Sequence, residues 1–421
     1  MKKKGKLMAL VSVMSMLFIA GCNDDNGEEG ITLDFWTNQL EPTYTEYLEE
    51  LINEYEEQNP EVTINWLDVP ADDLEEKVLA DVSSGNEPDV VNLDPSFASS
   101  LADVNATINM DEYVSEEDRD QYLDNAWEAN QIDGETFAIP WYLGTAVTHY
   151  NKGIFEEADL DPEQPPETFE EAKEYAEVID EETDAYGYFP SMDGTLSLQY
   201  MEQWGVSVTN DDGTAAFNTP EGVEVLDYFT ELYENGLIPS ESLTGEEREG
   251  TNFYQAGEVA FGGFILNEVE ENAPDIYDNT GVSDQITGEA EVKDLIVQNI
   301  VVPEPSDHHE EAVDFALFIT NPENQLEFAQ IAGSGVLPST EETLEDPYFS
   351  EVPENATVTD LVRVTEAEQL PDAELLVPPM ENLNELTTIM HDAFSKAMLG
   401  ETTSEEALAE AEEEWNNVVS E

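Results

Sequence analysis

The stretch IPWYLGTAVTHYNKGIF, from Ile139 to Phe155, decides how the chain is organised. It is rich in aromatic and β-branched side chains and contains no acidic residue, although the whole chain has 99 Asp and Glu residues. This composition is typical of largely buried strands. We therefore expect an extended segment through the middle of the molecule, and the flanking sequence shows what it connects.

Three strands separated by two helices are expected before this stretch. Apolar and polar residues alternate in Ile31–Gln39 and again in Glu61–Val69, whereas Pro88–Asp94 is nearly continuous in apolar residues. Between these strands, Thr43–Tyr55 and Asp72–Val82 have helical spacing. The order predicts a parallel, doubly wound α/β sheet.

Further helices are expected after the stretch, and they begin at recognisable N-caps. Thr168, Thr219, Asn321 and Thr403 each precede a helical run that opens with acidic residues or proline. A chain of 421 residues is too long for one small core. We expect two α/β domains.

The charge of the chain excludes one class of partner. The sequence has 12 Lys and Arg residues and a formal net charge of −87 at pH 7. Such a surface repels the phosphates of nucleic acids and anionic lipids, so we expect no nucleic-acid binding. The many aromatic residues argue against disorder. We interpret the acidity as a halophile's adaptation to concentrated salt, although another extreme habitat stays open.

The amino terminus has the features of an export signal. Lys2, Lys3, Lys4 and Lys6 precede a short apolar run that ends at Ala20, so residues 1–21 are expected to be a signal peptide. The ending Ile-Ala-Gly-Cys resembles a bacterial lipobox, which implies palmitate-type lipidation of Cys22. Residues 22–30 would then be a lipidated tether on the extracytoplasmic face of the cell membrane. An ordinary signal peptide with a chance cysteine is the alternative.

Catalytic and metal-binding motifs are mostly missing from the sequence. It has no GxSxG, HExxH, Walker or GxGxxG pattern, and its single cysteine excludes a thiolate cluster. The pair His308-His309 is read as part of a solvated loop. We therefore expect no enzyme, no cofactor and no metal, although a carboxylate pair for glycoside hydrolysis stays open among so many acids.

From Ile31 to its end, the chain resembles the extracellular solute-binding proteins of ABC importers, in particular the sugar-binding, maltose-binding-like branch (family 1). The resemblance rests on several segments in the same order, which are ITLDFWT, PDVVNLD, the opening stretch with its helix, AFNTPEGVEVLDYFTELYENGLI, NFYQAGEVAFGG and EEAVDFALFITNPENQLEFAQIAGSGVLPS. It implies two doubly wound α/β lobes joined by a hinge, the type II periplasmic-binding-protein-like fold.

The resemblance also implies domain boundaries. Lobe one would comprise residues 31–143 and 294–332, and lobe two residues 145–293 and 334–421. The first hinge would lie at Ile139–Leu143, and the chain would cross again near Ser334–Ser339. The ligand would bind between the lobes.

A sugar ligand would need aromatic rings for its C–H faces and polar side chains for its hydroxyls. On this basis the candidate ligand-binding residues are Trp36, Asn38, Gln39, Asp94, Trp141, Tyr142, Thr145, Trp204 and Phe264. Trp36 and Trp204 fit a core position equally well. Neighbours on a strand face opposite sides, so we expect at least one of Trp141 and Tyr142 to face the ligand.

These expectations describe a monomeric, non-enzymatic receptor that captures a sugar or oligosaccharide and delivers it to ABC permease subunits. Receptors of the same fold for a polyamine or for glycerol phosphate remain as alternatives, as does a surface glycosidase. An anionic ligand is disfavoured because so few basic residues are available.

Overall fold

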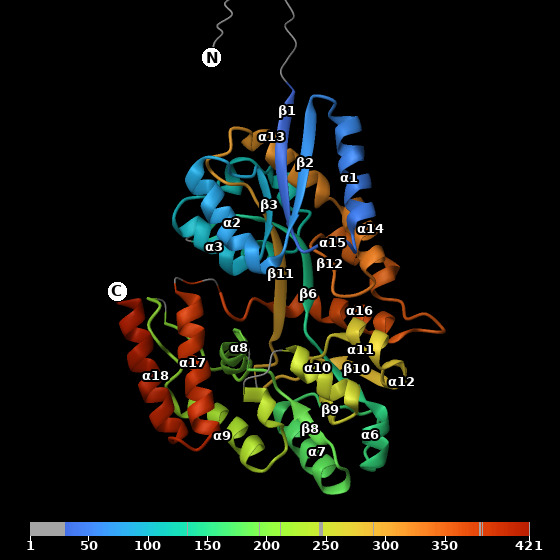
Figure 1. Ribbon diagram of the computed structural model, residues 1–421, viewed down its shortest axis with the longest axis vertical. Helices are drawn as coiled ribbons and strands as arrows, with labels where there is room; N and C mark the ends of the chain where they lie inside the picture. The colour runs from blue at the N-terminus through green and yellow to red at the C-terminus, as the bar shows by residue number, and fades with distance from the viewer. Residues whose placement is uncertain are drawn as a thin grey trace, which may run out of the picture.

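A computed structural model describes residues 30–132, 134–192, 194–210, 212–243, 247–288, 290–378, 380 and 382–420. These residues form two α/β lobes, each around its own sheet, and Figure 1 shows one lobe above the other. The expected signal peptide, Cys22 and all of the tether except Gly30 lie outside the described residues.

Lobe one holds the larger sheet, in the strand order β12-β6-β11-β3-β1-β2, with β13 paired beside β11. The β1 strand is parallel to β2 and β3, as the sequence predicts, whereas β11 runs antiparallel to β3 and β6. The bounds are β1 (Ile31–Asn38), β2 (Val62–Val69), β3 (Val90–Leu93), β6 (Ile139–Thr145), β11 (Lys293–Val301), β12 (Leu337–Pro338) and β13 (Ala373–Glu374).

Helices cover both faces of this sheet because side chains along each strand alternate between the faces. Leu33 and Phe35 pack in a core with α1, α13 and α14, whereas Trp36 packs on the opposite face with α2 and α3. The helices of lobe one are α1 (Thr45–Gln58), α2 (Ala71–Ser84), α3 (Pro95–Asp103), α4 (Glu116–Arg119), α5 (Asp124–Glu128), α13 (His309–Ile319), α14 (Pro322–Ala332) and α15 (Glu341–Leu344).

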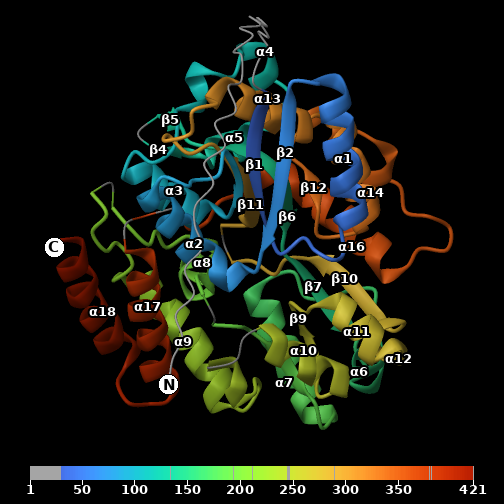
Figure 2. The same ribbon diagram turned by 45° about the horizontal axis from the view of Figure 1, so that its top comes forward.

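Lobe two holds a smaller sheet in the order β10-β7-β9-β8, with bounds β7 (Val147–Asn151), β8 (Tyr186–Phe189), β9 (Val259–Gly262) and β10 (Thr280–Asp284). Figures 1 and 2 show α17 and α18 side by side against α9. Its helices are α6 (Lys152–Glu157), α7 (Phe169–Glu182), α8 (Leu196–Gln203), α9 (Pro220–Glu234), α10 (Glu247–Ala256), α11 (Leu266–Asn272), α12 (Pro274–Tyr277), α17 (Leu383–Met398) and α18 (Ser404–Val419).

The N-caps predicted from the sequence are confirmed. The side chains of Thr168, Thr219, Asn321 and Thr403 each accept a hydrogen bond from a backbone N–H in the first turn of α7, α9, α14 and α18. Each bond satisfies one of the N–H groups that a helix start leaves without a partner.

The chain passes between the lobes at three places in the described residues. The opening stretch makes the first passage, since β6 lies in the sheet of lobe one and β7 in that of lobe two, with only Ala146 between them. The second passage lies between β10 of lobe two and β11 of lobe one, and the third lies between β13 and α17.

The third passage corrects the expected crossing near Ser334–Ser339. Leu337 and Pro338 form β12, which pairs with β6 at the edge of the lobe-one sheet, and Phe349 packs in the lobe-one core. Residues 334–349 therefore belong with lobe one, and the expected start of the last lobe-two segment is too early. A two-residue edge strand gives too little periodicity to be read from the sequence.

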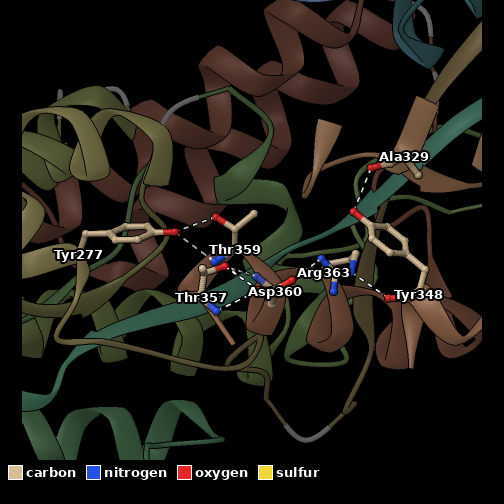
Figure 3. A network of polar contacts seen from close by, with 7 residues as sticks. All are labelled: Tyr277, Ala329, Tyr348, Thr357, Thr359, Asp360 and Arg363. Atoms are coloured by element: carbon tan, nitrogen blue, oxygen red, sulfur yellow. Dashed lines mark hydrogen bonds and ion pairs between the residues drawn. The ribbon is translucent and has the colours of Figure 1, made fainter. Parts of the chain in front are cut away.

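Helix α16 (Val358–Gln369) joins the lobes within its first two turns, as Figure 3 shows. On the lobe-two side, the Tyr277 hydroxyl lies 2.8 Å from Thr359 Oγ1. On the lobe-one side, Arg363 Nε donates to the Tyr348 carbonyl oxygen at 2.9 Å, and the Tyr348 hydroxyl donates to the Ala329 carbonyl oxygen at 3.3 Å. The Arg363 guanidinium also lies over the Tyr348 ring, 4.0 Å from its centre.

The last turn of α16 contacts two of the passages between the lobes. Gln369 Nε2 donates to the Ala146 carbonyl oxygen at 3.2 Å, and Gln369 Oε1 accepts from the Gln285 N–H at 3.0 Å. The Thr145 hydroxyl donates to the Glu366 carbonyl oxygen at 3.1 Å. Helix α16 thus links the first and second passages to each other.

Candidate functional site

Two adjoining cavities lie between the lobes. The larger, of about 330 Å³, is lined mainly by lobe-two residues, and the smaller, of about 190 Å³, mainly by lobe-one residues. Gln199, Asp294 and Ile296 line both cavities. Together the cavities form what we call the interlobe cleft, a position where ligand sites are common in two-lobed proteins.

The first half of β11 forms the lobe-one wall of the cleft. Asp294, Ile296 and Gln298 line the cavities at every second position. Leu295 and Val297 between them also line the smaller cavity, but they are 1% exposed and their side chains pack in the core. Ile296 is 47% exposed, so much of its apolar side chain is open to the cleft. The strand therefore presents one apolar and two polar side chains to the cleft.

The lobe-two wall is built from α8 and from strand ends. Leu196, Gln199 and Tyr200 lie at helical spacing on α8 and face the larger cavity together with Tyr188 and the glycine pair Gly262-Gly263. A Cβ at Gly262 would lie 2.9 Å from the Phe189 carbonyl oxygen, so this close approach requires glycine.

Asp294 lies where the two cavities meet and is only 6% exposed. Burial raises the pKa of its carboxyl group to about 7. Hydrogen bonds from the Leu376 N–H and the Gln199 side chain lower this pKa and so offset part of the rise. Its own N–H donates to Gln285 Oε1 at 2.9 Å. The carboxyl group is therefore held by the third passage and by lobe two, and the Asp294 backbone by the second passage.

Gln298 is held from behind by a fully buried asparagine. Asn92 Nδ2 lies 3.3 Å from Gln298 Oε1 and 3.2 Å from the Asn299 carbonyl oxygen. This contact uses the acceptor end of the Gln298 amide and leaves its two N–H donors for other partners. Asp94, at the N-terminus of α3, lines the same smaller cavity.

Most of the aromatic residues predicted from the sequence lie in cores instead. Trp36 is 5% exposed beneath α2, where the Lys77 ammonium lies 4.0 Å from its ring centre. Phe264 is 3% exposed and stacks on Tyr254 with ring centres 4.2 Å apart. Trp204 is half-buried and stacks on Phe169 at 4.7 Å.

Trp141 is fully buried, contrary to the expectation that the Trp141–Tyr142 pair would face opposite sides. Both rings contact Phe328, at 5.4 Å between ring centres in each case. The cause is a β-bulge, because Tyr142 pairs with Gln298 and Pro140 with Asn299, so Trp141 is an extra residue in β6. A bulge interrupts the alternation on which the expectation rested.

The remaining predicted residues have mixed positions. Thr145 is buried at the first passage and contacts α16, whereas Asn38 ends β1 with its buried Oδ1 unpaired, and Gln39 is exposed. Among the predicted ligand residues, Asp94 is the one that lines a cavity described here, and that cavity is the smaller one.

The sequence carried only a general signal for the cleft residues that were missed. KDLIVQN, from Lys293 to Asn299, is a short apolar run flanked by polar residues, which indicates a largely buried strand but does not show that Ile296 has one face away from the core. The pattern gives no information about what the strand meets.

Within the described residues, no group of three or more His, Cys, Asp and Glu side chains could hold a metal ion. The same residues contain no helix that is both long and apolar enough to cross a membrane.

Comparison with known proteins identifies the family. The family model for bacterial extracellular solute-binding proteins matches residues 41–326, which is more than half of the chain. The chain belongs to this family, as its resemblance indicates, and the two-lobed α/β fold is confirmed. Its role is therefore to bind a solute outside the cytoplasm.

Individual relatives agree with this assignment. One is a periplasmic-binding protein of Synechococcus sp. MITs9220, and its name refers to an oligosaccharide. It is 33% identical with a TM-score of 0.84, and the match covers 92% of this chain and 99% of that one. The cyclic α-maltosyl-1,6-maltose binding protein of Arthrobacter globiformis is 24% identical, with a TM-score of 0.80 and coverage of 93% and 99%. The sn-glycerol-3-phosphate-binding periplasmic protein of Escherichia coli (strain K12) is 24% identical, and 94% of each chain is covered.

Proposed function

We propose that this protein is the substrate-binding component of an ABC importer and captures an uncharged sugar or oligosaccharide in the interlobe cleft. The observation that carries the proposal is the pair of adjoining cavities, which share lining residues from both lobes. Closure of the lobes would trap the solute and create the surface that the membrane permease recognises.

The lining side chains suit such a ligand. Ile296, Leu196, Tyr188 and Tyr200 offer apolar and aromatic surface for the C–H faces of a sugar ring. Gln298, Gln199, Asp94 and Asp294 offer amide donors and carboxylate acceptors for its hydroxyls. The relatives with names that refer to oligosaccharides and to a cyclic maltosyl-maltose support the same ligand class.

Glycerol phosphate is the main competing ligand, because one relative is named for it. Among the described residues that line the two cavities, however, there is no Lys, Arg or His to pair with a phosphate. A polyamine would suit the carboxylates but would use little of the apolar surface. Catalysis is not proposed, because the family and the named relatives are binding proteins.

The cellular setting is part of the proposal. Lipidation of Cys22 would attach the protein, as a monomer, to the extracytoplasmic face of the membrane, and the tether would allow it to reach the permease. With 99 acidic and 12 basic residues most carboxylates have no basic partner, which supports an environment of concentrated salt.

A thermal-shift screen in molar salt tests the function, followed by titration calorimetry of every hit. The screen would include linear and cyclic maltooligosaccharides, spermidine and sn-glycerol 3-phosphate. We expect a neutral glycan to raise the melting temperature, because a ligand that binds only the folded state stabilises it. Chromatography should recover that glycan unchanged, whereas its cleavage would indicate a glycosidase and exclusive binding of the phosphate or spermidine would contradict the proposal.

A further inference from the structure

Asp294 has unused hydrogen-bonding capacity that points to a ligand. A carboxylate has about four acceptor positions. The Leu376 N–H and the Gln199 side chain occupy two of them, while the residue itself lines both cavities. A buried carboxylate with open acceptor positions carries a desolvation cost that a hydroxyl donor from a bound solute would offset.

The charges around Asp294 are few and mostly negative. Asp94 also lines the smaller cavity, and Glu374 on β13 is paired with Asp294 in the sheet. On its own strand, Lys293 Nζ donates to the Gln285 carbonyl oxygen at 2.7 Å. From lobe two, burial raises the pKa values of Tyr188 and Tyr200 well above neutrality, so both hydroxyls are uncharged.

We propose that Asp294 is the specificity-determining residue of the cleft, accepting hydrogen bonds from the hydroxyls of a neutral glycan and excluding solutes that carry phosphate or carboxylate. This inference rests on the proposed function and adds to it the residue and the charge rule. Asp94 contributes to the exclusion, because a second negative charge lines the same cavity.

The position of Asp294 also makes affinity depend on pH. Burial raises the pKa of the free carboxyl group to about 7. Hydroxyl donors favour the ionised form, so binding lowers this pKa and releases protons near neutrality. Affinity for the glycan should therefore rise as the pH rises through about 7 and then level off.

Titration calorimetry from about pH 5.5 to about pH 8.5 in molar salt tests the inference, with maltose, maltotetraose and cyclic maltosyl-maltose as neutral probes and sn-glycerol 3-phosphate as the anion. The variant is Asp294→Asn, and the matched control is Glu366→Gln, a second buried carboxyl with a raised pKa that lies outside both cavities. We expect Asp294→Asn to bind the glycan about tenfold more weakly at high pH and to lose the pH dependence, because a neutral partner replaces a charged one. Glu366→Gln should keep both properties.

Each outcome decides one claim. A glycan affinity that rises with pH in the wild type supports the inference even if Asp294→Asn fails to fold. Glycan binding that is independent of pH, or unchanged in folded Asp294→Asn, overturns the inference and leaves the proposed function intact. Tight binding of sn-glycerol 3-phosphate by the wild type overturns the charge rule. If no neutral probe binds at any pH, the proposed function fails and the inference fails with it.

Discussion

The two walls of the interlobe cleft differ in how they are built. The lobe-one wall is a single strand, in which Asp294, Ile296 and Gln298 project at every second position and residues 295–298 pair with β6. The lobe-two wall combines one face of α8 with strand ends and the Gly262-Gly263 turn. One wall is a regular strand and carries the acids, and the other is irregular and supplies tyrosines and an amide.

This difference indicates a division of labour between the lobes. Side chains on a paired central strand are fixed before the ligand arrives, so they can select for charge at little entropic cost. The lobe-two wall meets the ligand when the lobes close, and its aromatic side chains add contact area. In this arrangement lobe one selects the ligand by charge and lobe two retains it. The following predictions test it.

The largest expected effect is loss of the whole fold, and with it of both walls of the cleft. At low ionic strength, repulsion between the unpaired carboxylates is no longer screened, and we expect the fold to be lost. Circular dichroism from molar to about 10 mM salt measures this. An unchanged far-ultraviolet spectrum and melting temperature would contradict the halophilic interpretation and would leave the cleft unaffected.

The second effect separates the core of lobe one from its wall. Trp141→Ala should lower the free energy of unfolding by about 3–5 kcal/mol, because it removes a fully buried aromatic side chain that stacks on Phe328. Denaturant titration measures this loss. Glycan affinity in the folded fraction should stay within about twofold of the wild type. A much larger loss of affinity would indicate that Trp141 belongs to the binding site.

The third effect concerns Glu366, the second buried carboxyl group with a raised pKa. Glu366 on α16 has a folded-state pKa of about 7, above its ordinary value of 4.5, because it is buried. Between those values the folded state binds more protons than the unfolded state, so stability should fall as the pH rises from about 4.5 to 7. At about pH 8, Glu366→Gln should be more stable than the wild type by on the order of 2–3 kcal/mol. Chemical denaturation at several pH values checks this, and a wild type that gains stability over that pH range would show the opposite sign.

The smallest effect concerns the apolar side chain of the lobe-one wall. Ile296→Ala should weaken glycan binding by about 1–1.5 kcal/mol, or roughly tenfold, because it removes apolar surface that the ligand would cover. Since the side chain is 47% exposed, the loss of stability should be below about 1 kcal/mol. Leu196→Ala in lobe two is the matched variant, and calorimetry should show an affinity loss for both.

The fold followed from the sequence because its signals are local and agree with one another. The alternation in Ile31–Asn38 and the N-caps at Thr168 and Thr403 specify elements without reference to the rest of the chain. The strand–helix order then restricts the arrangement of those elements to a doubly wound sheet.

The site did not follow, because it depends on contacts between distant segments. The residues near Trp141 in the sequence do not predict the bulge that turns its ring towards Phe328. Likewise, Asp294 lies against Leu376 and Gln199, which are far from it in the sequence. Aromatic composition marked the right region of the chain, but packing decided which side chains were left for a ligand.

The most direct test is a crystal structure of the protein grown with maltotetraose, or with whichever neutral glycan the thermal screen identifies. We expect the ligand between β11 and α8, with a hydroxyl within hydrogen-bond distance of the Asp294 carboxylate and a ring face against Ile296 or Tyr200. A glycan bound elsewhere, for example against Trp204 or Tyr142 and out of reach of β11, would contradict the assignment of the interlobe cleft.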